Sequence, residues 1–312
     1  MLLVKIFGII FFSYVLGKTT DHLIKHLLKF SKVFKIGQFE ATAVIMAMAT
    51  SFPEILVSIT SSLAGVSDLA LGNAIGSNVV NLSLVIGVTA VAGRTLHFKG
   101  GGAIKNHFLP LAYTFIPFLL LWDGELSRID GIILILIYVI YISGLLKHKG
   151  GVTEEEKPTR SGKISVTVLK MGVWMGLLLL SSQAIVYLAK DLAMEFNLPV
   201  LFVGLFMVAV GTSLPELVFN VKAATKRKIS MGIGNIVGSC VANSTLVIGL
   251  SALILPIQVT NAYHIVLPGL EYLLVVILVV AFVRSKHRLE WWEGLVLVIL
   301  FGYYTAVGMT VF

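Results

Sequence analysis

Apolar side chains dominate this 312-residue chain: 57% of its residues are hydrophobic, 13% are charged, and the mean hydropathy is +0.95. A soluble core of this length needs far less apolar surface, so composition excludes a soluble globular protein and predicts one that crosses a membrane several times. The formal net charge of +8 does not indicate nucleic-acid binding, because the basic residues gather in loops between apolar segments. The single cysteine, Cys240, excludes an intramolecular disulfide framework.

Ten apolar segments are long enough to cross about 30 Å of hydrocarbon at about 1.5 Å per residue. They predict membrane-spanning helices near residues 1–17, 38–63, 69–92, 107–122, 129–146, 164–189, 199–222, 229–255, 264–283 and 290–311. The predicted fold class is therefore an all-α membrane protein with ten transmembrane helices. Residues 148–162 are the one stretch that reads as a solvated linker, and they are too few to bury a core of their own.

Lysine and arginine are divided unequally between the two sets of loops. Twenty of the 24 follow the first, third, fifth, seventh and ninth spans, whereas the opposite side has only Lys5, Arg128 and Lys190. The positive-inside rule therefore places the central loop in the cytoplasm and both termini outside, in a multi-pass protein of the cytoplasmic membrane. Residues 18–35, in which His22 and His26 stand among five lysines, are predicted to form a basic amphipathic segment at the cytoplasmic headgroups.

The second span carries a set of polar side chains on one face. Their spacing of i, i+3, i+4 and i+7 puts on that face Ala47, Thr50, Ser51 and Glu54. Pro53 lacks an N–H and crowds the carbonyl four residues earlier, which frees the backbone oxygen of Ala49 and distorts the helix. Distorted backbone at membrane depth is tolerated where it is buried in protein or lines a site.

The third span also carries polar side chains on one face, and two of them are amides. Asn73, Ser77 and Asn81 are spaced i, i+4 and i+8, beside Gly72 and Gly76. Glycines at this spacing are typical of surfaces where two helix backbones approach closely. We expect this packing to bring the third and eighth spans close to the second and seventh.

Both groups recur in the second half of the chain, and every matched position is displaced by the same amount. The seventh span contains Ala209, Thr212, Ser213, Pro215 and Glu216, with the freed carbonyl on Gly211, and the eighth contains Gly234, Asn235, Gly238, Ser239 and Asn243. The halves 1–147 and 163–312 each hold five spans, an odd number, so the second copy enters the membrane from the opposite side. Inverted repeats of this kind are typical of alternating-access transporters, whose substrate site lies where the halves meet.

The chemistry of the repeated residues indicates a hard cation. A charged group at mid-bilayer costs about 2.5 to 3.5 kcal/mol on insertion scales, so a cluster built twice needs something to offset it. Carboxylates, hydroxyls, amides and carbonyls are oxygen ligands, whereas zinc, copper and iron sites usually use nitrogen or sulfur. Two ionised glutamates neutralise one Ca²⁺ or two Na⁺. The alternative is a pair of protonated glutamates, Glu54 and Glu216, hydrogen-bonded inside a helix bundle.

The two copies of Thr-Ser-x-Pro-Glu and of Gly-Asn-x-x-Gly-Ser-x-x-x-Asn resemble the alpha repeats of the sodium/calcium exchanger family, within the cation/calcium exchanger superfamily. The resemblance covers the whole chain and is to the prokaryotic ten-helix type. It implies an antiporter with three Na⁺ sites and one Ca²⁺ site around Glu54 and Glu216.

The resemblance also implies a role for each position of the motifs. The inner-facing part of the site would be lined by the Ala47 carbonyl with Thr50, Ser51 and Ser77, and the outer-facing part by the Ala209 carbonyl with Thr212, Ser213 and Ser239. Asn81 and Asn243 would hold the central position. Some family members have Asp at one of these two positions; here both are Asn, so the site has two formal negative charges.

We therefore predict a secondary active antiporter that exchanges Na⁺ for Ca²⁺ by alternating access, with no enzymatic activity, cofactor, nucleic-acid partner or obligate protein partner. Following the family, the first and sixth spans are the helices expected to move. Three alternatives stay open. The first is an antiporter of the same fold that uses H⁺ or carries another divalent cation, the second is a passive cation channel, and the third is an intramembrane hydrolase, for which no His-Glu-x-x-His site is present.

Overall fold

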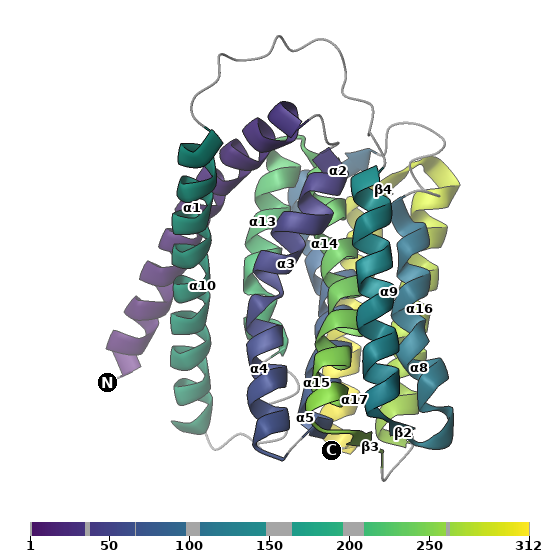
Figure 1. Cartoon of the computed structure of the whole chain (residues 1–312). Helices are drawn as coiled ribbons and strands as arrows, with labels where there is room; N and C mark the ends of the chain where they lie inside the picture. Colours follow the sequence, from purple (N-terminus) through teal and green to yellow (C-terminus); the bar gives the residue numbers. More distant parts are fainter. Residues whose placement is uncertain are drawn as a thin grey trace.

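The computed structural model describes residues 2–34, 38–65, 67–97, 107–147, 164–195, 209–259 and 263–311. These residues form a bundle of helices, in which α1 (Leu2–Phe34) and α10 (Ile164–Glu195) lie side by side at one edge (Figure 1). The all-α class predicted from the sequence is confirmed. Four strands of two or three residues, which the sequence analysis did not predict, lie at the ends of the bundle.

In the first half, α1 is followed by two broken helices. Their pieces are α2 (Gln38–Ala41), the π-helical η1 (Thr42–Met46), α3 (Ala47–Thr50) and α4 (Phe52–Leu63), and then α5 (Ser67–Val80), the π-helical η2 (Asn81–Val85) and α6 (Ile86–Gly93). The chain continues through β1 (Thr95–His97), the 3₁₀-helical η3 (Leu109–Phe115), α8 (Ile116–Leu120), the 3₁₀-helical η4 (Leu121–Asp123), β2 (Glu125–Leu126) and α9 (Arg128–Lys147).

The second half has a matching order after α10. It contains α12 (Ala209–Thr212), α13 (Leu214–Thr225), α14 (Ile229–Ala242), the π-helical η6 (Asn243–Val247) and α15 (Ile248–Ile254). After β3 (Ile257–Gln258) come α16 (Tyr263–Lys286), β4 (Arg288–Glu290) and α17 (Trp291–Val311). The predicted linker 148–162 and the start of the predicted seventh span lie outside the described residues.

Two predicted spans differ from the structure. The first was expected to end near residue 17, but α1 continues to Phe34, so the basic segment belongs to the same helix. The fourth is largely 3₁₀-helical and divided into short pieces, with Pro110 in the first turn of η3 and Pro117 in the first turn of α8. The other predicted segments coincide with helices wherever the structure describes them.

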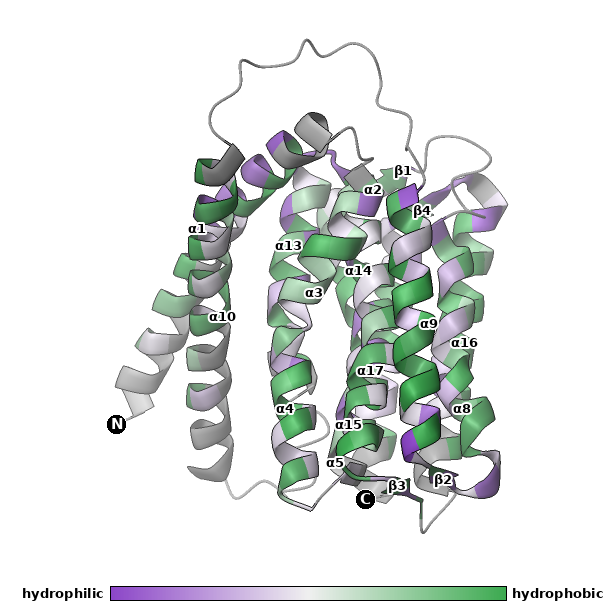
Figure 2. Cartoon of the chain, viewed as in Figure 1, coloured by the Kyte–Doolittle hydropathy of each residue, from purple (hydrophilic) through white to green (hydrophobic). Residues whose placement is uncertain are grey.

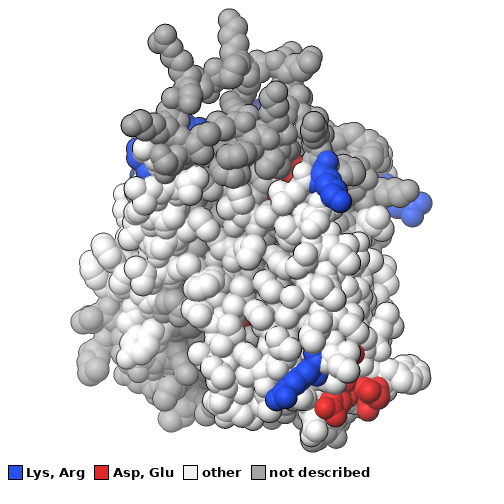
Figure 3. All heavy atoms as spheres, in the orientation of Figure 1, with Lys and Arg blue, Asp and Glu red and all other residues white. Residues whose placement is uncertain are grey.

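The helices at the periphery present apolar surfaces outward. On α9, Leu134 and Tyr138 are buried, whereas Leu136 and Ile140 are 55% and 65% exposed. Hydrophobic residues cover this side of the bundle in Figure 2, and Figure 3 shows Lys, Arg, Asp and Glu mainly near its two ends. An apolar belt between charged ends is the surface expected of a protein in a bilayer.

Within the described residues, four helices are long and apolar enough to cross a membrane: Ala70–Gly93, Arg128–Lys147, Ile229–Ile254 and Pro268–Ser285. A fifth candidate is the pair Phe39–Thr50 and Phe52–Leu63, which is bent by 43° at its break. The multi-pass character is thus supported, while the total of ten spans stays a prediction.

The same helix contact occurs twice. A Cβ atom placed on Gly87 of α6 would lie 2.6 Å from the carbonyl oxygen of Gly294 on α17, and one on Gly131 of α9 would lie 2.7 Å from that of Gly249 on α15. Gly249 is the counterpart of Gly87 in the second half of the chain, and Gly294 is the counterpart of Gly131. In each contact, two helix backbones touch where only glycine leaves room.

The pairing of the short strands also occurs twice, once for each half of the chain. β1 pairs with β4 and β2 pairs with β3, both antiparallel. In the order of the two halves, β3 is the counterpart of β1, and β4 is the counterpart of β2. Each two-stranded ribbon thus joins one strand from each half of the chain, and the two ribbons are equivalent to each other. One ribbon lies at each end of the bundle (Figure 1).

Candidate ion-binding site

Both predicted helix distortions lie next to a glutamate. α3 ends at Thr50 and α4 begins at Phe52, with Ser51 between them at φ −80° and ψ 4°. In the second copy, Ser213 at φ −85° and ψ 5° separates α12 from α13. Proline in the first turn of each following helix suits that position, because its missing N–H has no partner to lose there.

Each break places a carboxylate at a helix N-terminus. Glu54 lies in the first turn of α4, and Glu216 lies in the first turn of α13. The N–H groups of the first turn carry partial positive charge, which favours a nearby anion. The break thus aids the burial of each glutamate in the middle of the bundle.

Hydroxyl groups from both copies face each carboxylate. The hydroxyls of Ser77 and Thr212 face Glu54, and those of Ser239 and Thr50 face Glu216. Each glutamate thus meets the serine of its own copy and the threonine of the other. The threonine of each copy faces the glutamate of the other because the broken helices cross. The spacing of residues within one helix could not reveal this crossing.

Several of these contacts have hydrogen-bond geometry. Ser239 Oγ donates to Glu216 Oε1 at 3.2 Å, and the Ser239 and Thr50 hydroxyls are 3.4 Å apart. Thr50 Oγ1 also lies 3.3 Å from Asn235 Oδ1 and 3.4 Å from the Ala47 carbonyl oxygen. The structure therefore joins Ala47 and Thr50 of the first copy to Asn235, Ser239 and Glu216 of the second.

The site is closed to solvent in this structure. The side chains of Glu54, Glu216, Asn81 and Asn243 are 0% exposed. The two carboxylates are close enough to repel each other. Like charges that are buried together are stable only with compensation, which either a bound cation or a proton on one of the two carboxyl groups would provide.

Many buried polar atoms at this point make no hydrogen bond. Among the described side chains they include both carboxylate oxygens of Glu54, Oε2 of Glu216, the hydroxyls of Ser51, Ser77 and Ser213, and both amide atoms of Asn73, Asn81 and Asn243. A native protein usually has only a few such atoms per 100 residues, and each requires an explanation. Apart from the three amide nitrogens, these atoms are oxygens, and a concentration of oxygen atoms without hydrogen-bond partners fits the coordination of a hard cation.

Asn81 and Asn243 occupy equivalent irregular turns. Each is the first residue of a π-helical segment, η2 for Asn81 and η6 for Asn243. Single π-helical turns inside α-helices occur frequently at functional sites, because they redirect a side chain and backbone groups. The family resemblance implied a central position for both asparagines, but nothing in the sequence predicted these π-helical turns.

Two glycines of the second copy lie where α14 packs closely on the first broken helix. A Cβ atom on Gly234 of α14 would collide with the Phe39 carbonyl oxygen, and one on Gly238 would collide with that of Ala43. Close approach of α14 to the first broken helix is therefore what brings Ser239 to Thr50. Gly72 and Gly76 lie on α5, which contacts α12, but close packing at these two glycines stays a prediction.

The remaining predicted positions are consistent with this arrangement. Pro53 and Pro215 are buried beside the glutamates, and Ala209 begins α12, one turn before the break at Ser213. The side chain of Ala209 lies outside the described part of the chain. Coordination by its carbonyl oxygen therefore stays an expectation.

Two buried amides near the site were missed. Asn78 Nδ2 donates to the Cys240 carbonyl oxygen at 3.3 Å and to Ser244 Oγ at 2.7 Å, which connects α5 to α14 and η6. Asn220 Nδ2 donates to the Glu216 carbonyl oxygen at 2.8 Å. The occurrence of an amide in an apolar span could have identified both residues. They were not singled out because the corresponding position in the other copy of the repeat is not an asparagine in either case.

Comparisons with known proteins agree with the geometry. The family model described as "Sodium/calcium exchanger protein" matches residues 4–147 and 167–309. The inner membrane protein YrbG of Escherichia coli is 32% identical over 251 residues, which cover 76% of each chain. The sodium/calcium exchanger MaX1 of Methanosarcina acetivorans is 26% identical over 342 residues, covering 96% of this chain and 95% of that protein.

A solved structure shares the fold over nearly its whole length. The sodium-calcium exchanger NCX_Mj, soaked with 10 mM Na⁺ and 10 mM Sr²⁺, aligns with a TM-score of 0.83 at 24% sequence identity and covers 98% of this chain and 99% of that one. The family model accounts for most of the chain, and the similarity to the relative from E. coli extends over most of it as well. The chain belongs to the sodium/calcium exchanger protein family.

Proposed function

We propose that this protein exchanges Na⁺ for Ca²⁺ across the cytoplasmic membrane by alternating access. The observation that carries the proposal is the pair of fully buried carboxylates, Glu54 and Glu216, each facing hydroxyls from both copies of one motif. Membership of the family supports the choice of ions, and so does the relative MaX1, which is named a sodium/calcium exchanger. Nothing in the site favours H⁺ as the coupling ion over Na⁺.

The proposed ion ligands are the oxygen atoms of the two motif copies. They come from Ala47, Thr50, Ser51, Glu54, Ser77, Asn81, Ala209, Thr212, Ser213, Glu216, Ser239 and Asn243. Ca²⁺ accepts six to eight oxygen ligands, and this set exceeds that number. Two carboxylates balance one Ca²⁺ or two Na⁺, so the same oxygens can serve both ions in turn.

Alternation between the two sides requires one part of the bundle to move against the rest. We propose that α1 and α10 are the moving part. They contact each other along the edge of the bundle, and none of the proposed ligands lies on either helix (Figure 1). The proposed repeats are residues 1–147 and 163–312, inverted with respect to each other, with residues 148–162 in the cytoplasm and both termini outside.

The test is Ca²⁺ uptake into liposomes that contain the purified protein. Vesicles loaded with Na⁺ are diluted into Na⁺, into K⁺, or into a medium of different pH. We expect uptake of radioactive Ca²⁺ only with an outward Na⁺ gradient. Glu54→Gln and Glu216→Gln should each reduce uptake by about 10- to 100-fold or more, since losing even an outer partner of a metal ligand costs that much.

Glu125→Gln is the matched control, because Glu125 lies in β2 at the end of the bundle. It should exchange like the unmodified protein. Uptake driven by the pH step alone would identify a proton-coupled antiporter. Flux that persists without a counter-ion would identify a channel, and full activity of both glutamine variants would refute the site.

A further inference from the structure

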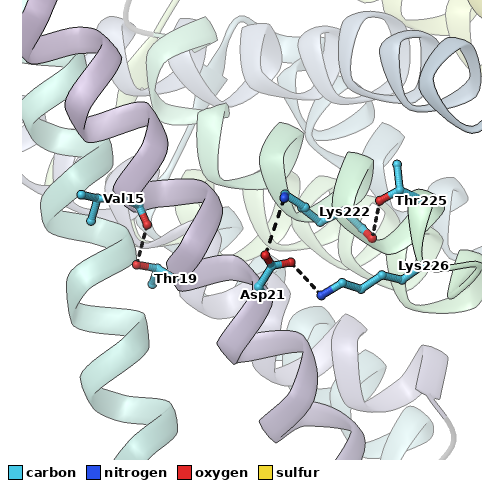
Figure 4. A network of polar contacts seen from close by, with 6 residues as sticks. All are labelled: Val15, Thr19, Asp21, Lys222, Thr225 and Lys226. Atoms are coloured by element: carbon cyan, nitrogen blue, oxygen red, sulfur yellow. Dashed lines mark hydrogen bonds and ion pairs between the residues drawn. The ribbon is translucent and has the colours of Figure 1, made fainter.

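An ion-paired cluster connects α1 to α13 at one end of the bundle. This is the end at which the loops after the odd-numbered predicted spans carry most of the lysines and arginines, and it is called the lysine-rich end below. Lys226 Nζ lies 2.7 Å from Asp21 Oδ1, and Lys222 Nζ lies 3.6 Å from Asp21 Oδ2. Figure 4 shows the Asp21 carboxylate extending from α1 between the two lysines of α13. One acidic side chain on the edge helix thus binds two cations on the helix that carries Glu216.

The cluster is positioned to stay charged. Partial burial raises the pKa of Asp21, but the hydrogen bond and charge of Lys226, together with Lys222, outweigh it and bring the pKa of Asp21 below its ordinary value. The cations belong to the last turn and C-terminal cap of α13, where the helix dipole favours positive charge. By contrast, the Arg288–Glu290 pair lies within one strand, β4, and joins no separate elements.

Beside the cluster, a groove separates α1 from α13. It has a volume of about 450 Å³, and its walls include Tyr14 of α1, Val88 of α6, and Leu217 and Val218 of α13. Asp21 and Lys222 line the same groove. Leu217, Val218, Val221 and Lys222 share one face of α13, which is turned away from the fully buried side chain of Glu216. The groove therefore separates α1 from the outer face of α13.

Apolar packing on the other side of Asp21 completes the contact. Leu23, Ile24 and Leu27 of α1 belong to one buried cluster with Phe219 and Ala223 of α13. The two helices are thus held together near the lysine-rich end and stand apart along the groove. A displacement of α1 at this contact would widen the groove.

We propose that Asp21, Lys222 and Lys226 form a charge latch, which holds α1 on α13 and keeps the groove between them narrow. Release of the latch lets α1 move away from α13, which is the displacement that the proposed alternation requires. The side chains of Asp21, Lys222 and Lys226 are 27%, 39% and 36% exposed, and ion pairs this accessible contribute little. The latch therefore biases the conformations without locking them. Its role in transport rests on the proposed function, but its effect on the groove does not.

The first experiment measures access to the groove without any transport. Val218→Cys is introduced with Cys240→Ala, which removes the only native thiol, and labelling by a membrane-impermeant maleimide is timed from the lysine-rich side. Asp21→Asn should raise the labelling rate by about two- to fivefold, the range for loss of an exposed ion pair. Val221→Cys, also in the groove wall, serves if the first position perturbs folding.

Charge reversal separates an ion pair from a local packing effect. Asp21→Lys combined with Lys222→Glu and Lys226→Glu restores opposite charges and should return the labelling rate to that of the parent. Asp123→Asn, an equivalent acid-to-amide change at the other end of the bundle, should have no effect. Equal rates in the Asp21→Asn variant and its parent, or failure of the reversed charges to restore slow labelling, would overturn the latch.

The second experiment uses exchange. In oriented vesicles, Asp21→Asn should lower the Ca²⁺ concentration for half-maximal exchange on the lysine-rich side by about two- to fivefold and raise it on the opposite side, because a shift of population favours one side at the expense of the other. An equal change on both sides would contradict the latch. A parent protein without any Ca²⁺ exchange would refute the proposed function, and the labelling rates would still decide whether the latch exists.

Discussion

Individual oxygen atoms decide what the site can bind. Thr50 contacts Ser239, Asn235 and the Ala47 carbonyl oxygen with one hydroxyl, at 3.3 to 3.4 Å. These distances are long for hydroxyl hydrogen bonds. They are consistent with a group of oxygen atoms arranged around a shared point more than with a hydrogen-bonded network that stabilises itself.

Thr50→Val removes this hydroxyl and keeps the shape of the side chain. The loss of one partner in a buried polar group costs about 1–2 kcal/mol, so the Ca²⁺ concentration for half-maximal exchange should rise by about 5- to 30-fold. Thr60→Val on the exposed face of α4 is the matched control and should exchange normally. An unchanged Ca²⁺ dependence in the Thr50 variant would exclude its hydroxyl from the site.

Helix packing determines whether these oxygen atoms meet. α14 lies so close to the first broken helix that Gly238 faces the Ala43 carbonyl oxygen and is 2.7 Å, measured from an ideal Cβ, from the Ala47 Cβ. The spacing of the glycines predicted such a contact but could not identify the partner. That depends on how two segments from opposite halves of the chain cross in space.

Gly238→Ala should separate these helices. Forcing an extra methyl group into a packed core typically costs about 1–3 kcal/mol, so both the midpoint of thermal unfolding in detergent and the exchange rate should fall. Gly144→Ala is the control, because nothing lies within 4 Å of the added Cβ on α9, and alanine favours helix over glycine. Equal unfolding midpoints for the two variants would show that the contact at Gly238 is not tight.

At the scale of the whole molecule, the arrangement of α1 and α10 makes a prediction about movement. The rings of His22 on α1 and Trp174 on α10 stack with their centroids 4.2 Å apart. α1 meets α13 at the Asp21 cluster and at the apolar cluster beside it. If α1 and α10 move as a pair, the contact between α1 and α10 persists during transport, whereas the contact between α1 and α13 changes.

Cysteine pairs in the Cys240→Ala background distinguish these contacts. Joining positions 22 and 174 with a cleavable bifunctional reagent should leave Na⁺-driven Ca²⁺ uptake intact, whereas joining positions 21 and 226 should stop it until the link is cleaved. A reagent that reacts with single thiols controls for modification alone. Uptake that continues with α1 linked to α13 would show that this contact need not open.

The sequence by itself determined which residues are the candidate ligands. Carboxylates, hydroxyls and amides are too costly in hydrocarbon to occur twice at identical spacing without a role, and spacing within one helix determines which of them share a face. The proline before each glutamate likewise predicted the break in the helix that the structure has at Ser51 and Ser213.

The tertiary structure alone decided which faces meet. It directs Thr212 toward Glu54 and Thr50 toward Glu216, brings Asn78 to Ser244, and joins Asp21 to two lysines of α13. It also extends α1 to Phe34, because the basic segment packs on neighbouring helices through Leu23, Ile24 and Leu27. Local periodicity contains no information on such contacts, since they depend on how helices distant in sequence cross and pack.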